Sequence, residues 1–185
     1  MTDLLRLDAT ALVLLGHDVA LIPDTALANP TPCAGWTVAD LLRHMNERHE
    51  AAIRTLLPPL DSPAEDPRDD FPLIATRWVT AVAAAGPTLH LPGRGPTSTD
   101  WLLGVHLVDM LVHRWDLAQA TDTAMAVPAG LLDAALPLAQ ANTGGPLTGP
   151  GRAYGPRVDS GPTAPVLDQI VALLGRDPHW SANRT

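Results

Sequence analysis

The segment from Trp101 to Ala120 constrains this chain most strongly, because it is mostly apolar and yet carries ionisable side chains at helical spacing. No glycine or proline follows Gly104 within it, so the segment predicts a buried helix. Burying ionisable groups costs several kcal/mol unless they pair with one another or bind a metal. The ionisable side chains of this segment therefore form either a hydrogen-bonded network or a metal site. At about 3.6 residues per turn, one helix face presents His106, Asp109, His113 and Asp116.

The composition describes a globular chain of 185 residues, 46% of them hydrophobic, which is long enough for one domain with its own core. Its net charge of −8 argues against binding to the phosphate backbone of nucleic acids. No apolar run reaches the length of a membrane span, and the first residues carry no basic start of a signal peptide. We therefore expect a cytoplasmic protein that binds neither nucleic acid nor membrane.

Two residue types limit the chemistry. Lysine is absent, which excludes lysine Schiff bases and a P-loop lysine. The single cysteine, Cys33, excludes an internal disulfide and a structural zinc site built from several cysteines. Cys33 itself precedes a predicted helix N-terminus, which would favour a nucleophilic thiol. The alternative, which we favour, is a small buried residue that fixes its loop.

Capping and turn signals divide the chain into helices joined by long Pro- and Gly-rich loops. Thr37 and Asp40 form a capping-box pattern that begins a helix, and Gly175 fits the position just after a helix end. The stretches 86–97 and 142–162 are predicted as irregular connections, apart from a short extended piece over 154–159. One all-α domain over residues 1–185 is the simplest account. The predicted helices cover residues 3–20, 37–57, 71–85, 101–120, 130–141 and 164–174.

His44 is a further candidate ligand, on the predicted helix 37–57 and four residues after Asp40, which could orient its imidazole. Together with Asp109 and His113 it would make a set of two nitrogens and one carboxylate with an open fourth position, as in catalytic zinc sites. Zn²⁺, Fe²⁺, Mn²⁺ and Ni²⁺ all suit such donors. Spacing alone leaves open that these side chains are ordinary surface or core residues.

The other polar residues near this set each have two or more interpretations. His106 is a fourth ligand, a general base or a solvent-facing residue. His49 lies about 140° around its helix from the ligand position and is expected to be solvated. Arg114 either binds an anionic substrate or pairs with Asp116, and the pairing is favoured.

Two stretches, residues 31–44 and 109–118, resemble the mycothiol-dependent maleylpyruvate isomerase N-terminal family, a branch of the DinB/YfiT-like superfamily of metal-binding bundles. The closing residues 175–180 are similar to the end of a subgroup of small proteins in that branch. The resemblance implies a four-helix bundle of up-down-down-up type with extra C-terminal helices. It also implies a divalent ion, most often zinc, held by His44, Asp109 and His113. The isomerase itself carries Glu at the position of Asp109. The aspartate of this chain is the shorter carboxylate.

The resemblance further implies an enzyme, a metal-dependent thiol S-transferase or isomerase. The metal would activate a low-molecular-weight thiol such as mycothiol, or water, to attack or isomerise a small electrophilic substrate. His106 or Asp116 would then handle protons, and Arg114 would steer an anionic group. Bundles of this type often form homodimers. The alternative is a non-enzymatic bundle in which the ion is structural or regulatory.

Overall fold

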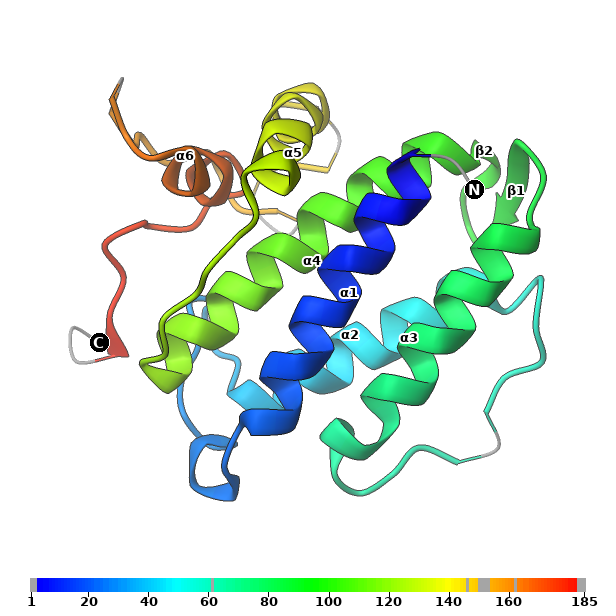
Figure 1. The fold of residues 1–185 in the computed structure, drawn as a ribbon, viewed down its shortest axis with the longest axis horizontal. Helices are drawn as coiled ribbons and strands as arrows, with labels where there is room; N and C mark the ends of the chain where they lie inside the picture. The colour runs from blue at the N-terminus through cyan, green and yellow to red at the C-terminus, as the bar shows by residue number, and fades with distance from the viewer. Residues whose placement is uncertain (1–2, 61, 146, 150–153, 162, 183–185) are drawn as a thin grey trace.

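A computed structural model describes residues 3–60, 62–145, 147–149, 154–161 and 163–182. The chain is mostly helical, as predicted, with one small hairpin where an irregular connection was expected (Figure 1). The elements in order are α1 (Asp3–Leu21), the 3₁₀ turn η1 (Asp24–Ala26), α2 (Val38–Ile53), α3 (Pro67–Ala84), β1 (Thr88–Leu91), β2 (Gly95–Ser98), α4 (Thr99–Thr121), α5 (Ala129–Asn142) and α6 (Val166–Leu173).

The central element is α4, which contacts α1, α2, α5, α6 and β2 and buries most of its residues. Ser98 caps its start, because the hydroxyl oxygen accepts from the Trp101 N–H at 3.3 Å. Asp122, in the left-handed conformation, ends it. In Figure 1 α1 lies alongside α4, while α5 and α6 cover its other side. None of the described helices, α4 included, combines the length and apolarity needed to cross a membrane.

Two helix starts show how local sequence fixes the boundaries. Thr37 and Asp40 form the predicted capping box: the Thr37 hydroxyl accepts from the Asp40 N–H at 3.2 Å, and the Asp40 carboxylate accepts from the Thr37 N–H at 3.0 Å. The next helix, α3, begins earlier than predicted, at Pro67. Asp66 caps it by accepting from the Arg68 N–H at 2.9 Å, and proline is well suited to the first helical position.

The hairpin corrects the expectation of an irregular loop over 86–97. Its two strands pair antiparallel, from Thr88 opposite Ser98 to Leu91 opposite Gly95. Gly93, at φ 75, makes the turn between them. Glycine and proline are rare in strands, so the composition of this stretch indicated a loop although four residues on each side pair.

The end of α6 is a Schellman motif with Gly175 in the predicted position. The Gly175 N–H donates to the Ala172 carbonyl at 3.1 Å, and the Arg176 N–H donates to the Val171 carbonyl at 3.0 Å. Gly175 has φ +83, and a Cβ on it would lie 2.6 Å from the Cα of Gly155. Only glycine therefore permits the close approach that places residues 154–155 beside residues 175–176.

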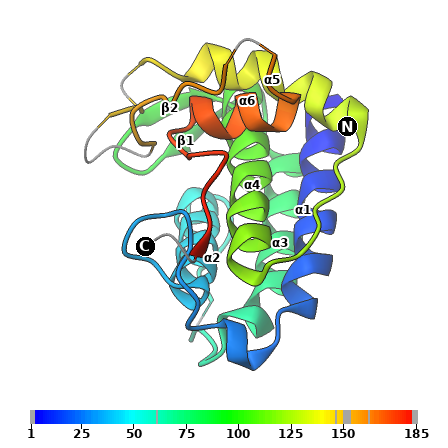
Figure 2. The same ribbon diagram turned by 90° about the vertical axis from the view of Figure 1, so that its left-hand side faces the viewer.

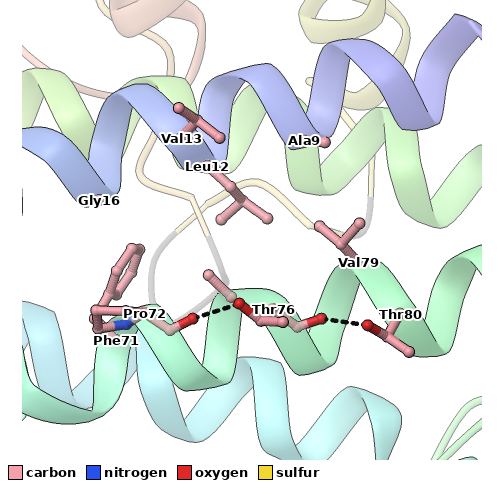
Figure 3. Close-up of a pocket in the computed structure, with 10 residues that line it drawn as sticks. Ala9, Leu12, Val13, Gly16, Phe71, Pro72, Thr76, Val79 and Thr80 are labelled. Carbon is pink, nitrogen blue, oxygen red and sulfur yellow. Dashed lines mark hydrogen bonds between the residues drawn. The ribbon is translucent and has the colours of Figure 1, made fainter.

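A cavity of about 380 Å³ lies between α1 and α3 (Figure 3). Apolar side chains such as Leu12, Phe71 and Val79 line it, and no ionisable residue does. The hydroxyls of Thr76 and Thr80 donate to carbonyls of their own helix at 2.8 Å. The cavity therefore presents no free polar group for chemistry, and the ionisable clusters lie elsewhere.

Candidate functional site

Helices α2 and α4 bring His44, Asp109 and His113 close together. His113 Nε2 lies 3.6 Å from Asp109 Oδ2, and the His44 and His113 rings meet edge to face with 5.8 Å between centroids. Two ligands on one tetrahedral ion at about 2.1 Å lie roughly 3.4 Å apart, so the first distance suits two groups that share an ion. His113 is buried, whereas the side chain of Asp109 is 27% exposed, so the cluster opens to solvent.

The orientation of His113 is fixed by Asp116. His113 Nδ1 lies 3.0 Å from Asp116 Oδ2, which leaves Nε2 facing Asp109. A carboxylate on the far nitrogen of the imidazole is the usual partner of a metal-binding histidine, because it sets the tautomer and the ring angle. The pair therefore presents the nitrogen that a ligand role requires.

Asp116 is fully buried, and donors surround its carboxylate. Besides His113, it accepts from Arg176 Nη2 at 3.0 Å and Nε at 3.3 Å, and from the Cys33 thiol at 3.2 Å. Among the described residues, the set whose ligand atoms all lie within 4.8 Å of one another is Cys33, His113 and Asp116, and the set of His44, Asp109 and His113 does not meet that spacing. However, Arg176 Nη2 lies 3.1 Å from Cys33 Sγ, so the guanidinium occupies the place of a cation there. Cys33 and Asp116 thus both contact Arg176, and Asp116 also contacts His113.

The two histidines of the cluster have opposite pKa shifts. Burial, followed by the positive charge of His113, lowers the pKa of His44 to about 4, so its ring is neutral at neutral pH and keeps a free lone pair. Burial also opposes charge on His113, but the carboxylates of Asp109 and Asp116 outweigh it and raise the pKa to about 10. A positive charge is thus favoured at His113 in the metal-free chain.

Two residues at this site were not predicted from the sequence, Tyr154 and Arg176. Tyr154 lies beside Asp109, and burial together with the Asp109 carboxylate raises the pKa of its hydroxyl, so it keeps its proton. Trp36 adds a wall, with its ring centroid 4.5 Å from that of His44. Nothing local in the sequence marks Tyr154, whereas Arg176 lies in the stretch 175–180, whose resemblance to a subgroup of small proteins was the signal but assigned it no role at the site.

His106 lies in a second buried network. Its Nδ1 is 2.5 Å from Asp8 Oδ1, and its Nε2 is 2.7 Å from His49 Nε2. The indole of Trp78 stacks on His106 at 3.9 Å and donates to Asp8 Oδ2 at 2.8 Å. His49 Nδ1 lies 2.7 Å from the Met45 carbonyl and donates to it. The ionisable residues on this face of α4 thus belong to two separate networks, one that contains His113 and one that contains His106.

The expectation that His49 is solvated is wrong, because the residue is 2% exposed. It continues the buried series Leu41, Met45 and Ile53, which repeats every four residues along α2. That repeat was the signal in the sequence. Asp40 also differs from its expected role, because its carboxylate binds Thr37 at the helix start rather than His44.

Arg114 does not pair with Asp116. Its Nε donates to Asp18 at 2.6 Å and its Nη1 to the Ala126 carbonyl at 2.9 Å, so the guanidinium is buried between α1 and the segment before α5. The arginine that reaches Asp116 is Arg176. The catalytic roles expected of His106, Asp116 and Arg114 stay predictions.

The buried histidine pair predicts a specific loss of stability in acid. Burial, then the neighbouring His106, lowers the pKa of His49 well below 6.5, so the folded chain keeps it neutral while the unfolded chain protonates it. Its contribution is therefore present above pH 6.5 and lost as the pH falls. Below pH 6, we expect His49→Gln to reduce the slope of unfolding free energy against pH by about 1.4 kcal/mol per unit.

Urea unfolding of the metal-free protein at a series of pH values measures this slope. His90→Gln is the matched control, because His90 is exposed on the hairpin and should leave the slope unchanged. An identical slope in the wild type and His49→Gln would contradict the neutral, buried state of His49.

Comparison with known proteins places these residues in a family. The family model of the mycothiol maleylpyruvate isomerase N-terminal domain matches residues 10–118, which include His44, Asp109 and His113. Two Mycobacterium tuberculosis proteins, Uncharacterized protein Rv0738 of strain H37Rv and Uncharacterized protein MT0763 of strain CDC 1551, are each 33% identical over 158 residues, covering 81% of this chain and 85% of theirs. No solved structure matches the chain significantly. The chain belongs to the mycothiol maleylpyruvate isomerase N-terminal domain family.

Proposed function

We propose that this chain is a divalent-metal-dependent enzyme that uses a low-molecular-weight thiol, or water, to attack or isomerise a small electrophilic substrate. His44, Asp109 and His113 would hold the metal. The observation that carries the proposal is the pair formed by Asp109 and His113, whose Oδ2 and Nε2 lie 3.6 Å apart while Asp116 holds Nδ1, with the ring of His44 5.8 Å from that of His113 between centroids. Family membership supports the thiol as the cosubstrate.

The chemistry of the donors suits zinc first, with nickel, iron or manganese as alternatives. A divalent ion bound there would supply Lewis-acid chemistry and lower the pKa of a thiol or water beside it. Around it, the neutral His44 offers a lone pair, and Asp116 keeps His113 in the matching orientation. Trp36 and Tyr154 would exclude bulk water from one side and leave room for a small substrate at the exposed edge of Asp109.

We also infer that the first four helices form an up-down-down-up bundle of the DinB-like type within one domain. Contacts between side chains support this order. Asp8 and Asp18 of α1 meet His106 and Arg114 of α4 in the same sequence order, so these helices run parallel. His44 and His49 of α2 meet His113 and His106 in reverse order. Gly16 and Asp8 of α1 likewise meet Phe71 and Trp78 of α3 in reverse order.

The experiment begins with the metal content of protein purified without added metal. We expect about one equivalent of a divalent ion, most readily zinc. The metal-loaded protein, given mycothiol and a panel of small electrophiles, should either consume the thiol, as a transferase does, or convert the electrophile and return the thiol, as an isomerase does. In both cases we expect turnover of the electrophile. Removal of the ion with a chelator should abolish that turnover, and returning the ion should restore it.

A protein that binds the ion but converts no electrophile, with either the thiol or water, would favour a structural or regulatory ion. That alternative predicts that chelation unfolds the chain, as in small metal-dependent domains. A protein that takes up no divalent ion, even on reconstitution, would overturn the metal-dependent function altogether.

A further inference from the structure

The candidate metal site contacts two side chains that lie beyond the part of the chain matched by the family model. That match ends at residue 118, whereas Tyr154 and Arg176 belong to the segment after α5. Figure 2 shows this segment crossing α4 and descending toward α2. Both side chains are largely buried, with Tyr154 at 5% exposure and the Arg176 side chain at 10%.

The backbone holds each of them in place. Arg176 follows Gly175 in the Schellman motif, which turns the chain back toward α4. Tyr154 is fixed by two backbone bonds of 2.9 Å, one to Leu147 and one from Gly149. The close approach of Gly155 to Gly175 then joins the two segments side by side. Backbone contacts of the fold thus fix the positions of Tyr154 and Arg176.

Each side chain acts on a carboxylate of the site. Arg176 grips Asp116 through two bonds, Nη2 to Oδ2 at 3.0 Å and Nε to Oδ1 at 3.3 Å. A bidentate guanidinium fixes the plane of a carboxylate, and that carboxylate orients His113. Tyr154 is buried beside Asp109, the carboxylate expected to bind the metal, whose negative charge adds to burial in raising the pKa of the phenol.

We propose that Arg176 and Tyr154 are positioning residues of the metal site, Arg176 acting on His113 through Asp116 and Tyr154 acting directly on Asp109. The C-terminal segment therefore completes a site whose ligands all lie on α2 and α4. This inference rests on the proposed metal-binding function. Outer partners of metal ligands typically change metal affinity by about 10- to 100-fold.

The test compares Tyr154→Phe, Arg176→Met and Arg176→Lys with the wild type. Arg157→Ala is the matched control, because Arg157 belongs to the same segment and is exposed. Competition with a chromogenic chelator measures the Kd for zinc, and the visible spectrum of the cobalt-substituted protein reports ligand geometry. Urea unfolding of the metal-free proteins measures stability separately.

We expect Tyr154→Phe and Arg176→Met to raise the Kd about 10- to 100-fold and to shift the cobalt spectrum. Arg176→Lys should restore part of the affinity, since it keeps the charge but loses the bidentate grip. Arg157→Ala should match the wild type. A purely structural role would lower metal-free stability while leaving the cobalt spectrum unchanged, and that result would overturn the proposal.

The outcomes also separate this inference from the proposed function. A wild type that binds zinc, with variants of equal affinity and spectrum, would overturn only the positioning roles. A wild type that binds neither zinc nor cobalt would overturn both. If Arg176→Met fails to fold, Tyr154→Phe still decides, because it removes a single hydroxyl.

Discussion

His113→Ala should weaken zinc binding by roughly 10²- to 10³-fold. Structural zinc sites with four ligands contribute about 10–16 kcal/mol, or about 2.5–4 kcal/mol per ligand, and about 1.4 kcal/mol corresponds to each factor of ten. The fold should survive, because Asp116 keeps its two bonds to Arg176 when the imidazole is removed. Chelator competition on the purified variant, with circular dichroism to confirm folding, measures the change.

The matched variants sharpen this prediction. His44→Ala should lose affinity to a similar degree, since it removes another proposed ligand, which lies on α2 rather than α4. His90→Ala, an exposed histidine on the hairpin, should bind zinc like the wild type. Cys33→Ala discriminates between the two candidate ligand sets, and we expect it to change the Kd by less than tenfold. Unchanged zinc affinity in His113→Ala would refute the ligand assignment, whereas a loss in Cys33→Ala as large as in His113→Ala would move the site to the thiol.

Much of the helical fold follows from local sequence. The apolar segment around His106–Asp116, which has no glycine or proline after Gly104, predicted α4. Its ionisable residues had to be paired or bound to a metal, because burying them alone is costly. The Thr37–Asp40 capping box and Gly175 predicted two helix ends, since each satisfies backbone groups within a few residues. These features depend only on residues that are close in the sequence, so they could be predicted from it.

The remaining parts of the site depend on contacts between distant residues. Arg176 reaches Asp116 across 60 positions, and Asp8 reaches His106 across 98. The sequence could not show which arginine pairs with Asp116, so Arg114, adjacent in the helix, was the natural choice. Helix geometry instead sends Arg114 to Asp18 on α1.

The two networks divide the interface between α2 and α4. In the first network His44 faces His113, and in the second network His49 faces His106. Each network therefore contains one pair of imidazoles. The first pair is partly exposed and has a neutral ring beside a charged one, which suits ligand exchange. The second pair is enclosed by Trp78 and Phe71, and every ring nitrogen has a partner. We therefore expect the first pair to serve the proposed metal-binding function and the second pair to stabilise the fold.

The stability of the second network can be argued from its protons. His49 Nδ1 donates to the Met45 carbonyl, so its Nε2 accepts from the Nε2–H of His106. A single proton then lies between His106 Nδ1 and Asp8 Oδ1, on one atom or the other. Asp8 also accepts from the Trp78 indole. Its carboxyl thus serves two buried groups at once.

Asp8→Ala should therefore lower the free energy of unfolding by about 3–5 kcal/mol, the usual result of removing one partner from a buried pair. Asp8→Asn should cost about 1 kcal/mol or less, because its amide N–H can donate to neutral His106 while its oxygen accepts from Trp78. Asp3→Ala, an exposed carboxylate on the same helix, is the control and should change stability by less than about 0.5 kcal/mol. Urea unfolding at neutral pH measures all three. If Asp8→Ala and Asp8→Asn lower the free energy of unfolding equally, the network requires a charged Asp8. If Asp8→Ala has only a small effect, water replaces the carboxyl and the network is not a core element of the fold.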